Sequence, residues 1–141
     1  MKLLVCGGAG FIGSNFVRIR VRDHGDEVVV LDKLTYAGLR ENLQDLPEVL
    51  LIVGGIEDRE AVAEAIAGVD AVVNFAAETH VDRSISEPEA FITTHGMGTY
   101  VLLEAARERG LRYVHVSTDE VYGSIEEGSF TEESPLRPSS P

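Results

Sequence analysis

The sequence predicts an α/β fold in which helices cover both faces of a single parallel sheet. Short runs of β-branched and other apolar residues alternate along the chain with longer segments whose apolar residues recur at helical spacing. Most of the short runs are apolar at every position, as strands buried on both faces must be. The chain has 141 residues, which is enough for one domain and too few for two. We therefore expect one doubly wound domain over residues 1–141.

The expected strands lie at residues 2–6, 27–31, 49–53, 71–75 and 113–117, and the expected helices at residues 10–22, 37–45, 59–67 and 88–109. The last helix has a start signal, because Ser86 and Glu89 have the spacing of a capping box and Pro88 is tolerated in a first turn. It also has a stop signal in Gly110, which follows two nearby arginines. Residues 124–141 are rich in proline, glycine, serine and glutamate without periodicity, so we expect a loop there.

Charge and composition exclude several classes of function. Asp and Glu number 24 against 12 Lys and Arg, a net charge of −12, which has the wrong sign for a partner such as nucleic acid or an anionic membrane. Cys6 is the only cysteine, so no intrachain disulfide or cysteine-based zinc cage can form, and a reducing, cytoplasmic location fits best. The apolar stretch before Gly7 is too short for a signal peptide, and no apolar run approaches a membrane span. The histidines share no ligand spacing, so we expect no metal site.

The first expected strand runs directly into a glycine-rich turn at the start of the first expected helix. Gly7, Gly10 and Gly13 leave room for a tight turn, for a pyrophosphate against backbone N–H groups, and for close packing of helix on strand. The second expected strand is followed by Asp32, 19 residues after Gly13, where a dinucleotide site needs a carboxylate for the ribose hydroxyls. This pairing predicts a Rossmann-type dinucleotide site that prefers NAD, because the carboxylate repels the 2′-phosphate of NADP. Lys33 is either an exposed lysine or a cation that offsets this repulsion.

Polar residues also follow the fourth and fifth expected strands, at the edge where open α/β sheets bind ligands. A lone histidine such as His80 is more often structural than catalytic. Arg83 is equally consistent with a phosphate contact and with a solvated ion pair to Asp82. The adjacent acids Asp119 and Glu120 fit either an acid/base pair or a polar turn that leaves the sheet.

Five segments taken together resemble a known family. They are residues 7–16 (GGAGFIGSNF), 31–38 (LDKLTYAG), 76–85 (AAETHVDRSI), 98–107 (GTYVLLEAAR) and 116–123 (VSTDEVYG). The chain resembles, over its whole length, the dTDP-glucose 4,6-dehydratase family of the extended short-chain dehydrogenase/reductases. The resemblance implies a lyase of deoxysugar biosynthesis that converts dTDP-glucose to dTDP-4-keto-6-deoxyglucose with a tightly held, transiently reduced NAD.

The resemblance also implies roles for individual residues. Thr118 hydrogen-bonds the C4 oxygen of the sugar, Asp119 delivers a proton to the departing C6 hydroxyl, and Glu120 removes the C5 proton. His80 touches the substrate. The residues implied around NAD, beside the glycines, are Phe11, Ile12, Asp32, Lys33, Leu34, Thr35, Gly55, Ile56, Ala76, Ala77, Glu78, Thr79 and Thr94.

The chain departs from the family pattern at several positions. Cys6 replaces a usual threonine, the His95-Gly96 pair replaces Asn-Val, and Gly55-Ile56 replaces an Asp-Ile pair that bonds the adenine. Gly55→Asp is therefore expected to tighten NAD binding. The Tyr-x-x-x-Lys motif that supplies the base for the C4 hydroxyl is missing from residues 1–141.

We therefore expect the amino-terminal, NAD-binding part of a dehydratase, truncated before its substrate domain, homodimeric when complete and inactive as these 141 residues alone. Two alternatives remain at this stage. One is a nucleotide-sugar 4-epimerase of the same superfamily. Asp119 and Glu120 disfavour this alternative, because an epimerase removes no C5 proton and needs no acid/base pair for that step. The other is a non-catalytic dinucleotide-binding module.

Overall fold

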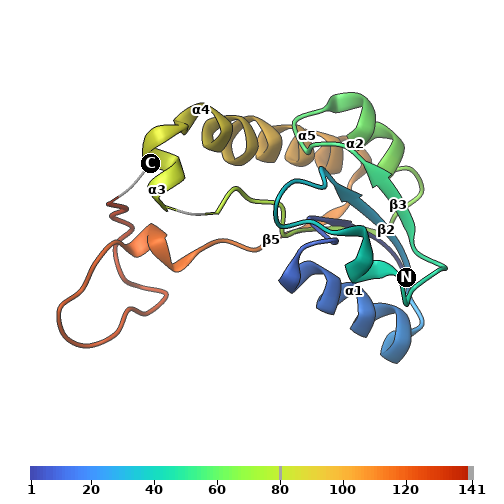
Figure 1. Ribbon diagram of the computed structural model, residues 1–141, viewed down its shortest axis with the longest axis horizontal. Helices are drawn as coiled ribbons and strands as arrows, with labels where there is room; N and C mark the ends of the chain where they lie inside the picture. Colours follow the sequence, from blue (N-terminus) through green and yellow to red (C-terminus); the bar gives the residue numbers. More distant parts are fainter. Residues whose placement is uncertain (80, 140–141) are drawn as a thin grey trace.

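The computed structural model describes residues 1–79 and 81–139, with the side chains of residues 81–83 left out (Figure 1). Five parallel strands form one sheet in the order β3-β2-β1-β4-β5, which confirms the predicted fold class. The strands are β1 (Lys2–Cys6), β2 (Glu27–Asp32), β3 (Leu50–Val53), β4 (Ala71–Asn74) and β5 (Arg112–His115). Each lies within two residues of its predicted bounds.

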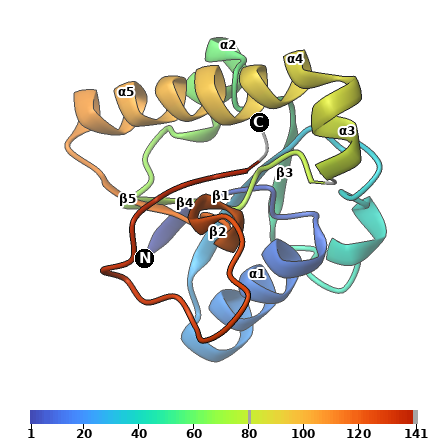
Figure 2. The same cartoon turned by 90° about the vertical axis from the view of Figure 1, so that its left-hand side faces the viewer.

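Helices cover both faces of the sheet, with α1 on one face and α2 and α5 on the other (Figures 1 and 2). The α-helices are α1 (Phe11–His24), α2 (Arg59–Ala65), α3 (Val81–Ser86), α4 (Pro88–Phe91) and α5 (Thr99–Arg109). A π-helical segment, η2 (Ile92–Gly98), joins α4 to α5, and two 3₁₀ turns lie at η1 (Arg40–Leu43) and η3 (Asp119–Tyr122). Among the described residues, none of these helices is long and apolar enough to cross a membrane.

The two faces of β1 supply the centres of two apolar layers. Leu3 and Val5 pack on the α1 side with Val17, whereas Leu4 and Cys6 pack on the opposite side with residues of α2 and α5. This follows from the two-residue period of a strand. Burial also raises the pKa of the Cys6 thiol, so Cys6 behaves as a small apolar core residue.

The expected helix at residues 37–45 is wrong, because only the short turn η1 forms there. Two hydrogen bonds tie this segment to the glycine turn. The Leu39 N–H donates to the Ala9 carbonyl over 3.1 Å, and the Asn42 amide donates to the same oxygen over 2.7 Å. Leu39 is extended, with φ −119° and ψ 132°, so the tertiary contact with Ala9 overrides the weak helical pattern.

The expected helix at residues 88–109 is confirmed as one continuous helical path through α4, η2 and α5. Ile92 and Thr99, at the two junctions, both have right-handed helical backbone. Pro88 lies in the first turn, and Gly110 ends the helix in the left-handed conformation with φ 64°. The predicted cap is one residue off, because Ser86 ends α3, a helix that the sequence pattern did not indicate, and Glu87 precedes α4.

The core makes a first prediction. Leu102 is fully buried between α5 and the sheet, so Leu102→Ala should lower the free energy of unfolding by about 2–5 kcal/mol through lost burial and the cavity left behind. The adjacent Leu103 is 45% exposed, and Leu103→Ala is the matched control, with a change near zero. Urea unfolding followed by circular dichroism measures both, and equal effects at the two positions would contradict the packing described here.

Candidate functional site

The strand order places the candidate site at the carboxyl ends of β1 and β4. The chain leaves β1 toward β2 on one side and reaches β4 on the other, so the connections diverge between these two central strands. Open α/β sheets bind ligands at such a point, because the loops there separate and leave a crevice. Figure 2 views the sheet from this edge, with α1 and the α4–α5 helical path on opposite sides.

The turn after β1 has no room for side chains at two of its glycines. Gly7 has φ +72°, and a Cβ there would lie 2.6 Å from the Ala76 nitrogen and 2.7 Å from the Phe75 carbonyl carbon. A Cβ on Gly13 would collide with the Gly7 carbonyl oxygen. Gly10 occupies the N-cap position of α1. The structure thus brings together the three glycines that the sequence motif singled out, with the chain after β4 packed directly against Gly7.

The first turn of α1 opens at this crevice. The N–H groups in the first turn of any α-helix lack an acceptor within the helix, and the helix dipole makes that end attractive to anions. Phe11 and Ile12, in this turn, are 83% and 64% exposed, although both are large apolar residues. Because the protein carries a net charge of −12, backbone N–H groups are the natural partners here for a phosphate.

Asp32 is held rigidly at the end of β2. Its carboxylate accepts the Ala9 N–H over 2.9 Å and the Leu34 N–H over 2.9 Å, and the residue is 8% exposed. The acid that the spacing predicted as the ribose ligand therefore lies against the glycine turn. Each carboxylate oxygen has a second lone pair with which to accept a ribose hydroxyl.

The residues after Asp32 adopt an unusual backbone conformation. Leu34 has φ +54°, the only positive φ among the described non-glycine residues. A branched residue in the left-handed region is strained, and its hydrogen bond to Asp32 helps to hold it there. Lys33 and Thr35, on either side, are exposed.

Residues 76–79, which follow β4, are held in place by hydrogen bonds to side chains from the loop after β2 and from the long helix. Buried Asn74 accepts the Ala76 N–H over 3.0 Å and so turns the chain out of the sheet. The Thr79 N–H donates to the Tyr36 hydroxyl over 3.1 Å, and the Glu78 N–H donates to His95 Nε2 over 2.9 Å. Residues 76–79, expected around the ribose and nicotinamide, are therefore positioned by the β2 loop and by the π-helical segment.

Sequence reasoning missed both of these positioning residues. Tyr36 lies within the LDKLTYAG segment and was assigned no role, yet its hydroxyl lies 3.0 Å from Thr79 Oγ1 as well as bonding the Thr79 backbone. His95 was considered only as a departure from the family pattern. It packs edge-on against Phe91, with ring centroids 5.5 Å apart, at the turn of η2 that faces Glu78. The pairings join residues far apart in the sequence, so no local signal could reveal them.

Other expected site residues are differently placed. Ile56 is 3% exposed and belongs to the core, and Thr94 is 7% exposed, so neither presents an open side-chain surface to a ligand. Gly55 is buried beneath the side chain of Glu57. His80 lies outside the described residues, as do the side chains of Asp82 and Arg83.

Thr118, Asp119 and Glu120 follow β5 and form the start of η3. The Thr118 hydroxyl accepts the Glu120 N–H over 3.2 Å and donates to the Asp119 carboxylate over 3.3 Å. All three residues are exposed. The chain leaves β5 on the side of the sheet where the parallel strands end (Figures 1 and 2), so this segment follows the same edge as the glycine turn.

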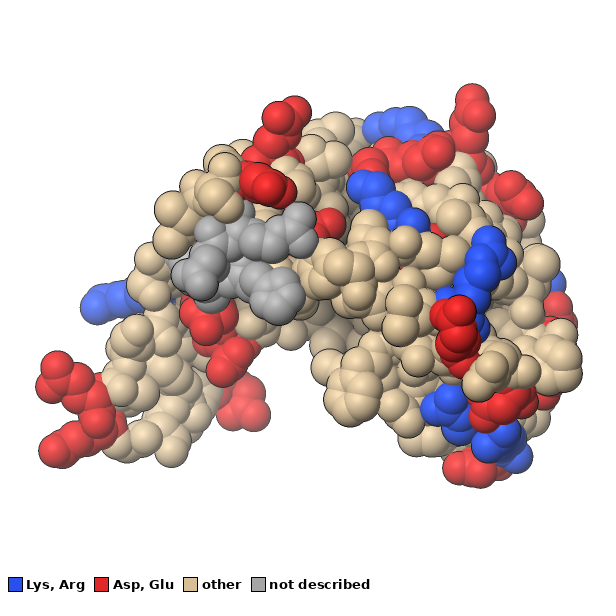
Figure 3. Space-filling view, viewed as in Figure 1, with Lys and Arg blue, Asp and Glu red and all other residues tan. Residues whose placement is uncertain are grey.

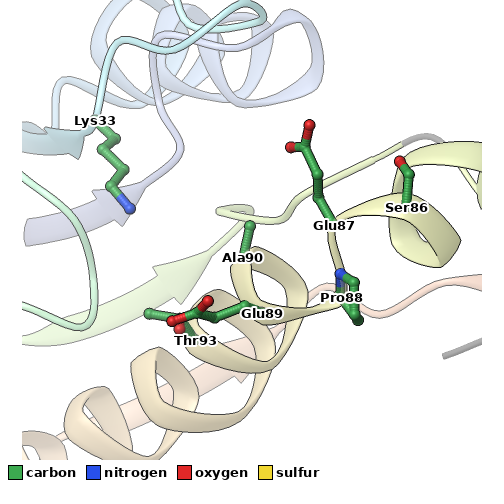
Figure 4. Close-up of a pocket in the computed structure, with 7 residues that line it drawn as sticks. All are labelled: Lys33, Ser86, Glu87, Pro88, Glu89, Ala90 and Thr93. Carbon is green, nitrogen blue, oxygen red and sulfur yellow. The ribbon is translucent and has the colours of Figure 1, made fainter.

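A hollow of about 650 Å³ lies next to this edge, within the range of small-molecule pockets. Figure 4 shows Lys33 on one wall and residues of α4 on the other. Two glutamates and one lysine are among its lining residues, which are Lys33, Ser86, Glu87, Pro88, Glu89, Ala90 and Thr93. Figure 3 likewise shows acidic side chains at many points of the surface. The hollow is therefore better suited to an uncharged group than to a phosphate.

Comparison with known proteins agrees with this geometry. The family model described as GDP-mannose 4,6 dehydratase matches residues 4–141. A curated dTDP-glucose 4,6-dehydratase of Mycobacterium tuberculosis (strain CDC 1551 / Oshkosh) is 53% identical over 146 residues, which cover 100% of this chain and 44% of that protein. The chain thus spans less than half the length of this relative.

Solved structures of nucleotide-sugar enzymes are also similar to this chain over nearly its whole length. The crystal structure of DesIV, a dTDP-glucose 4,6-dehydratase from Streptomyces venezuelae with NAD bound, superposes with a TM-score of 0.93 at 53% identity, covering 99% of this chain and 46% of that one. A UDP-glucose 4-epimerase from Thermus thermophilus in complex with NAD has a TM-score of 0.88 at 35% identity, covering 99% of this chain and 45% of that one. The dehydratase is the more similar of the two.

The contact between His95 and Glu78 makes a second prediction. Partial burial of the ring lowers the pKa of His95, and its Nε2 can accept the Glu78 N–H only while unprotonated. The stability from this contact is therefore fully present above the ordinary histidine pKa of about 6.5, and it is lost below that value as the pH falls through the lowered pKa of the folded protein. Between pH 7.5 and 5 we expect a loss of roughly 0.5–1.5 kcal/mol, the net value of one hydrogen bond.

Urea unfolding at several pH values measures this loss. His95→Asn should flatten the decline between pH 7.5 and 5, whereas His24→Asn, which removes an exposed imidazole at the end of α1, should not. Carboxylates with lowered pKa values, such as Asp45, lose their contribution only at more acidic pH. An unchanged slope in His95→Asn would contradict the role assigned to this ring.

Proposed function

The chain belongs to the GDP-mannose 4,6-dehydratase family, and from this premise we propose that it is the NAD-binding part of a dTDP-glucose 4,6-dehydratase. The curated relative and the DesIV structure, both dTDP-glucose 4,6-dehydratases, support this assignment. The chain spans 44% of the first and 46% of the second, so the substrate-binding half belongs to the remainder of such a protein. The reaction, its substrate and its partners are proposed for the complete protein.

The observation that carries the cofactor assignment is the position of Asp32 against the glycine turn. Its carboxylate bonds the Ala9 N–H, so a ribose on Asp32 lies next to the N-terminus of α1, where a pyrophosphate is best bound. Gly7 and Gly13 leave this surface bare of side chains. These residues fit NAD, and when bound it supplies the acceptor and donor of a hydride.

The proposed chemistry of this chain's own residues is acid–base. Thr118 hydrogen-bonds the C4 oxygen of the sugar, Glu120 takes the proton from C5, and Asp119 gives a proton to the hydroxyl that leaves C6. This step removes one water, as the C5 proton and the C6 hydroxyl, and leaves a C5–C6 double bond. Bound NAD would supply the hydride that C6 then needs, and Glu120 returns the proton to C5. A keto group at C4 acidifies the C5 proton, which brings it within reach of a carboxylate base. The Thr118 hydroxyl bonds the Asp119 carboxylate and the Glu120 backbone N–H, so it links the backbone of Glu120 to the side chain of Asp119.

Cytoplasmic location and a homodimer of the complete protein are parts of the same proposal. Buried, unpaired Cys6 is consistent with a reducing compartment. The nucleotide-sugar class of substrate follows from the named relatives. A 4-epimerase is the alternative reaction, and the adjacent acids Asp119 and Glu120 favour dehydration over it.

A third prediction tests the cofactor. Asp32→Asn keeps the size of the side chain but removes the charge, so NADH should bind about 10- to 150-fold more weakly. NADPH should lose much less affinity, because the repulsion of its 2′-phosphate disappears. Calorimetric titration of both cofactors gives the ratio, and Asp58→Asn, which alters the exposed cap of α2, is the control. Parallel losses for both cofactors in Asp32→Asn would contradict recognition of the ribose by this carboxylate.

A fourth prediction tests the reaction in the complete gene product. Glu120→Gln should spare hydride transfer but block loss of the C5 proton, so reduced nicotinamide accumulates on the enzyme while product release falls at least ~100-fold. Absorbance of reduced nicotinamide and an assay of 4-keto-6-deoxy sugar follow the two events. Glu126→Gln, at an exposed glutamate of the same segment, should leave both unchanged. A fully active Glu120→Gln enzyme would overturn this role. Product formation by the 141-residue chain alone would contradict the proposal that the reaction needs the rest of such a protein.

A further inference from the structure

The acids Asp119 and Glu120 lie on a turn that is too short to be stable by itself. η3 has four residues, whereas isolated helices shorter than about 12 residues are marginal in water. The Thr118 hydroxyl caps its start, and at its end the Gly123 N–H donates to the Glu120 carbonyl over 3.1 Å. Within the part of the chain that the structure describes, no hydrogen bond joins η3 to a strand or to another helix. The position of the two carboxylates must therefore be fixed by other contacts.

Residues 124–137 form a loop that lies outside the layers of sheet and helices (Figure 1) and returns to η3. The Arg137 N–H donates to the Val121 carbonyl over 3.0 Å, which joins the two ends of the loop. The ring of Phe130 stacks on the ring of Tyr122, with centroids 5.2 Å apart and planes inclined by 18°, a separation typical of aromatic pairs. Both rings are half-buried, although most of the loop is exposed. The loop therefore holds η3 through its backbone and through an aromatic stack.

The loop has a defined conformation of its own. Gly123, where it begins, has φ +83°, and a Cβ there would collide with the Arg137 carbonyl oxygen, so the close approach of the two ends requires glycine. After Phe130 the chain turns, because the Ser134 N–H donates to the Thr131 carbonyl over 3.0 Å and the Ser134 hydroxyl accepts the Thr131 N–H over 2.9 Å. These contacts bring Phe130 to one place beside Tyr122.

The stack acts on one end of the segment that carries the acids. Thr118 precedes η3 and is extended, with φ −127° and ψ 153°, so it continues the chain from β5. Tyr122, which stacks on Phe130, is the last residue of η3. Loss of the stack should therefore displace the Glu120 carboxylate more than the Thr118 hydroxyl. A displacement of about 1 Å is enough to slow a reaction step about 100-fold.

We propose that Phe130 is a positioning residue for the acid–base pair, because its stack on Tyr122 holds η3 and keeps the Glu120 carboxylate in place. This inference rests on the proposed function, since it takes Glu120 as the base that removes the C5 proton. Phe130 acts through Tyr122 rather than on the sugar. It should therefore govern loss of the C5 proton and not the earlier transfer of hydride, for which Thr118 bonds the C4 oxygen.

The experiment follows two steps of the reaction in the complete gene product. Phe130→Ala should leave the rate of nicotinamide reduction within about threefold of wild type, while release of 4-keto-6-deoxy sugar falls about 10- to 100-fold. Reduced nicotinamide should then accumulate on the enzyme, as in Glu120→Gln. Phe130→Tyr keeps the stacking ring and should restore product release to within about threefold of wild type. Ile125→Ala, which removes an exposed apolar side chain from the same loop, is the matched control and should change neither rate.

The outcomes separate this inference from the proposed function. Equal losses in both rates would show that Phe130 only stabilises the fold and would overturn the inference, as would unchanged product release in Phe130→Ala. If circular dichroism shows that Phe130→Ala does not fold, Phe130→Leu decides, and equal losses in both rates there overturn the role of Phe130. These results leave the proposed function standing. A wild-type protein that releases no 4-keto-6-deoxy sugar overturns the proposed function, and the inference with it.

Discussion

Two loops donate backbone N–H groups to one carboxylate at the end of β2. Ala9, from the glycine turn, and Leu34, from the loop after β2, both hydrogen-bond Asp32 at 2.9 Å. Charge-assisted hydrogen bonds of this kind are the stronger ones in proteins, and here they fix two otherwise irregular segments to each other. They also hold Leu34 in the left-handed conformation. The geometry of the crevice is therefore set before any ligand arrives, which lowers the entropic cost of binding.

The remainder of the crevice is assembled around that fixed point. From the loop after β2, Tyr36 reaches Thr79 in the loop after β4, and from the long helix His95 reaches the neighbouring Glu78. Two other elements of the fold thus converge on one short segment. His95 lies in a π-helical stretch within the long helix, and its ring holds Glu78 in place. Such π-helical turns inside longer helices often occur at functional sites.

Local patterns predicted most of the fold and part of the site. The continuous apolar runs marked the strands, and Gly110 marked a helix end, because both depend on nearby residues alone. The glycine spacing and Asp32 were predictable for the same reason. Tyr36 and His95 were not, because their partners lie far along the chain. The helix expected at residues 37–45 failed because the contact with Ala9 overrode a local preference.

The central claim is that the carboxyl ends of β1 and β4 form a ready-made dinucleotide site. Amide NMR spectra of the ¹⁵N-labelled chain, recorded as NADH is added, test it most directly. We predict that the largest shifts fall on Phe11, Ile12 and Gly13 at the N-terminus of α1 and on Leu34 beside Asp32, with the remainder of the spectrum nearly unchanged. Shifts gathered away from these residues, or none at saturating NADH, would contradict the account.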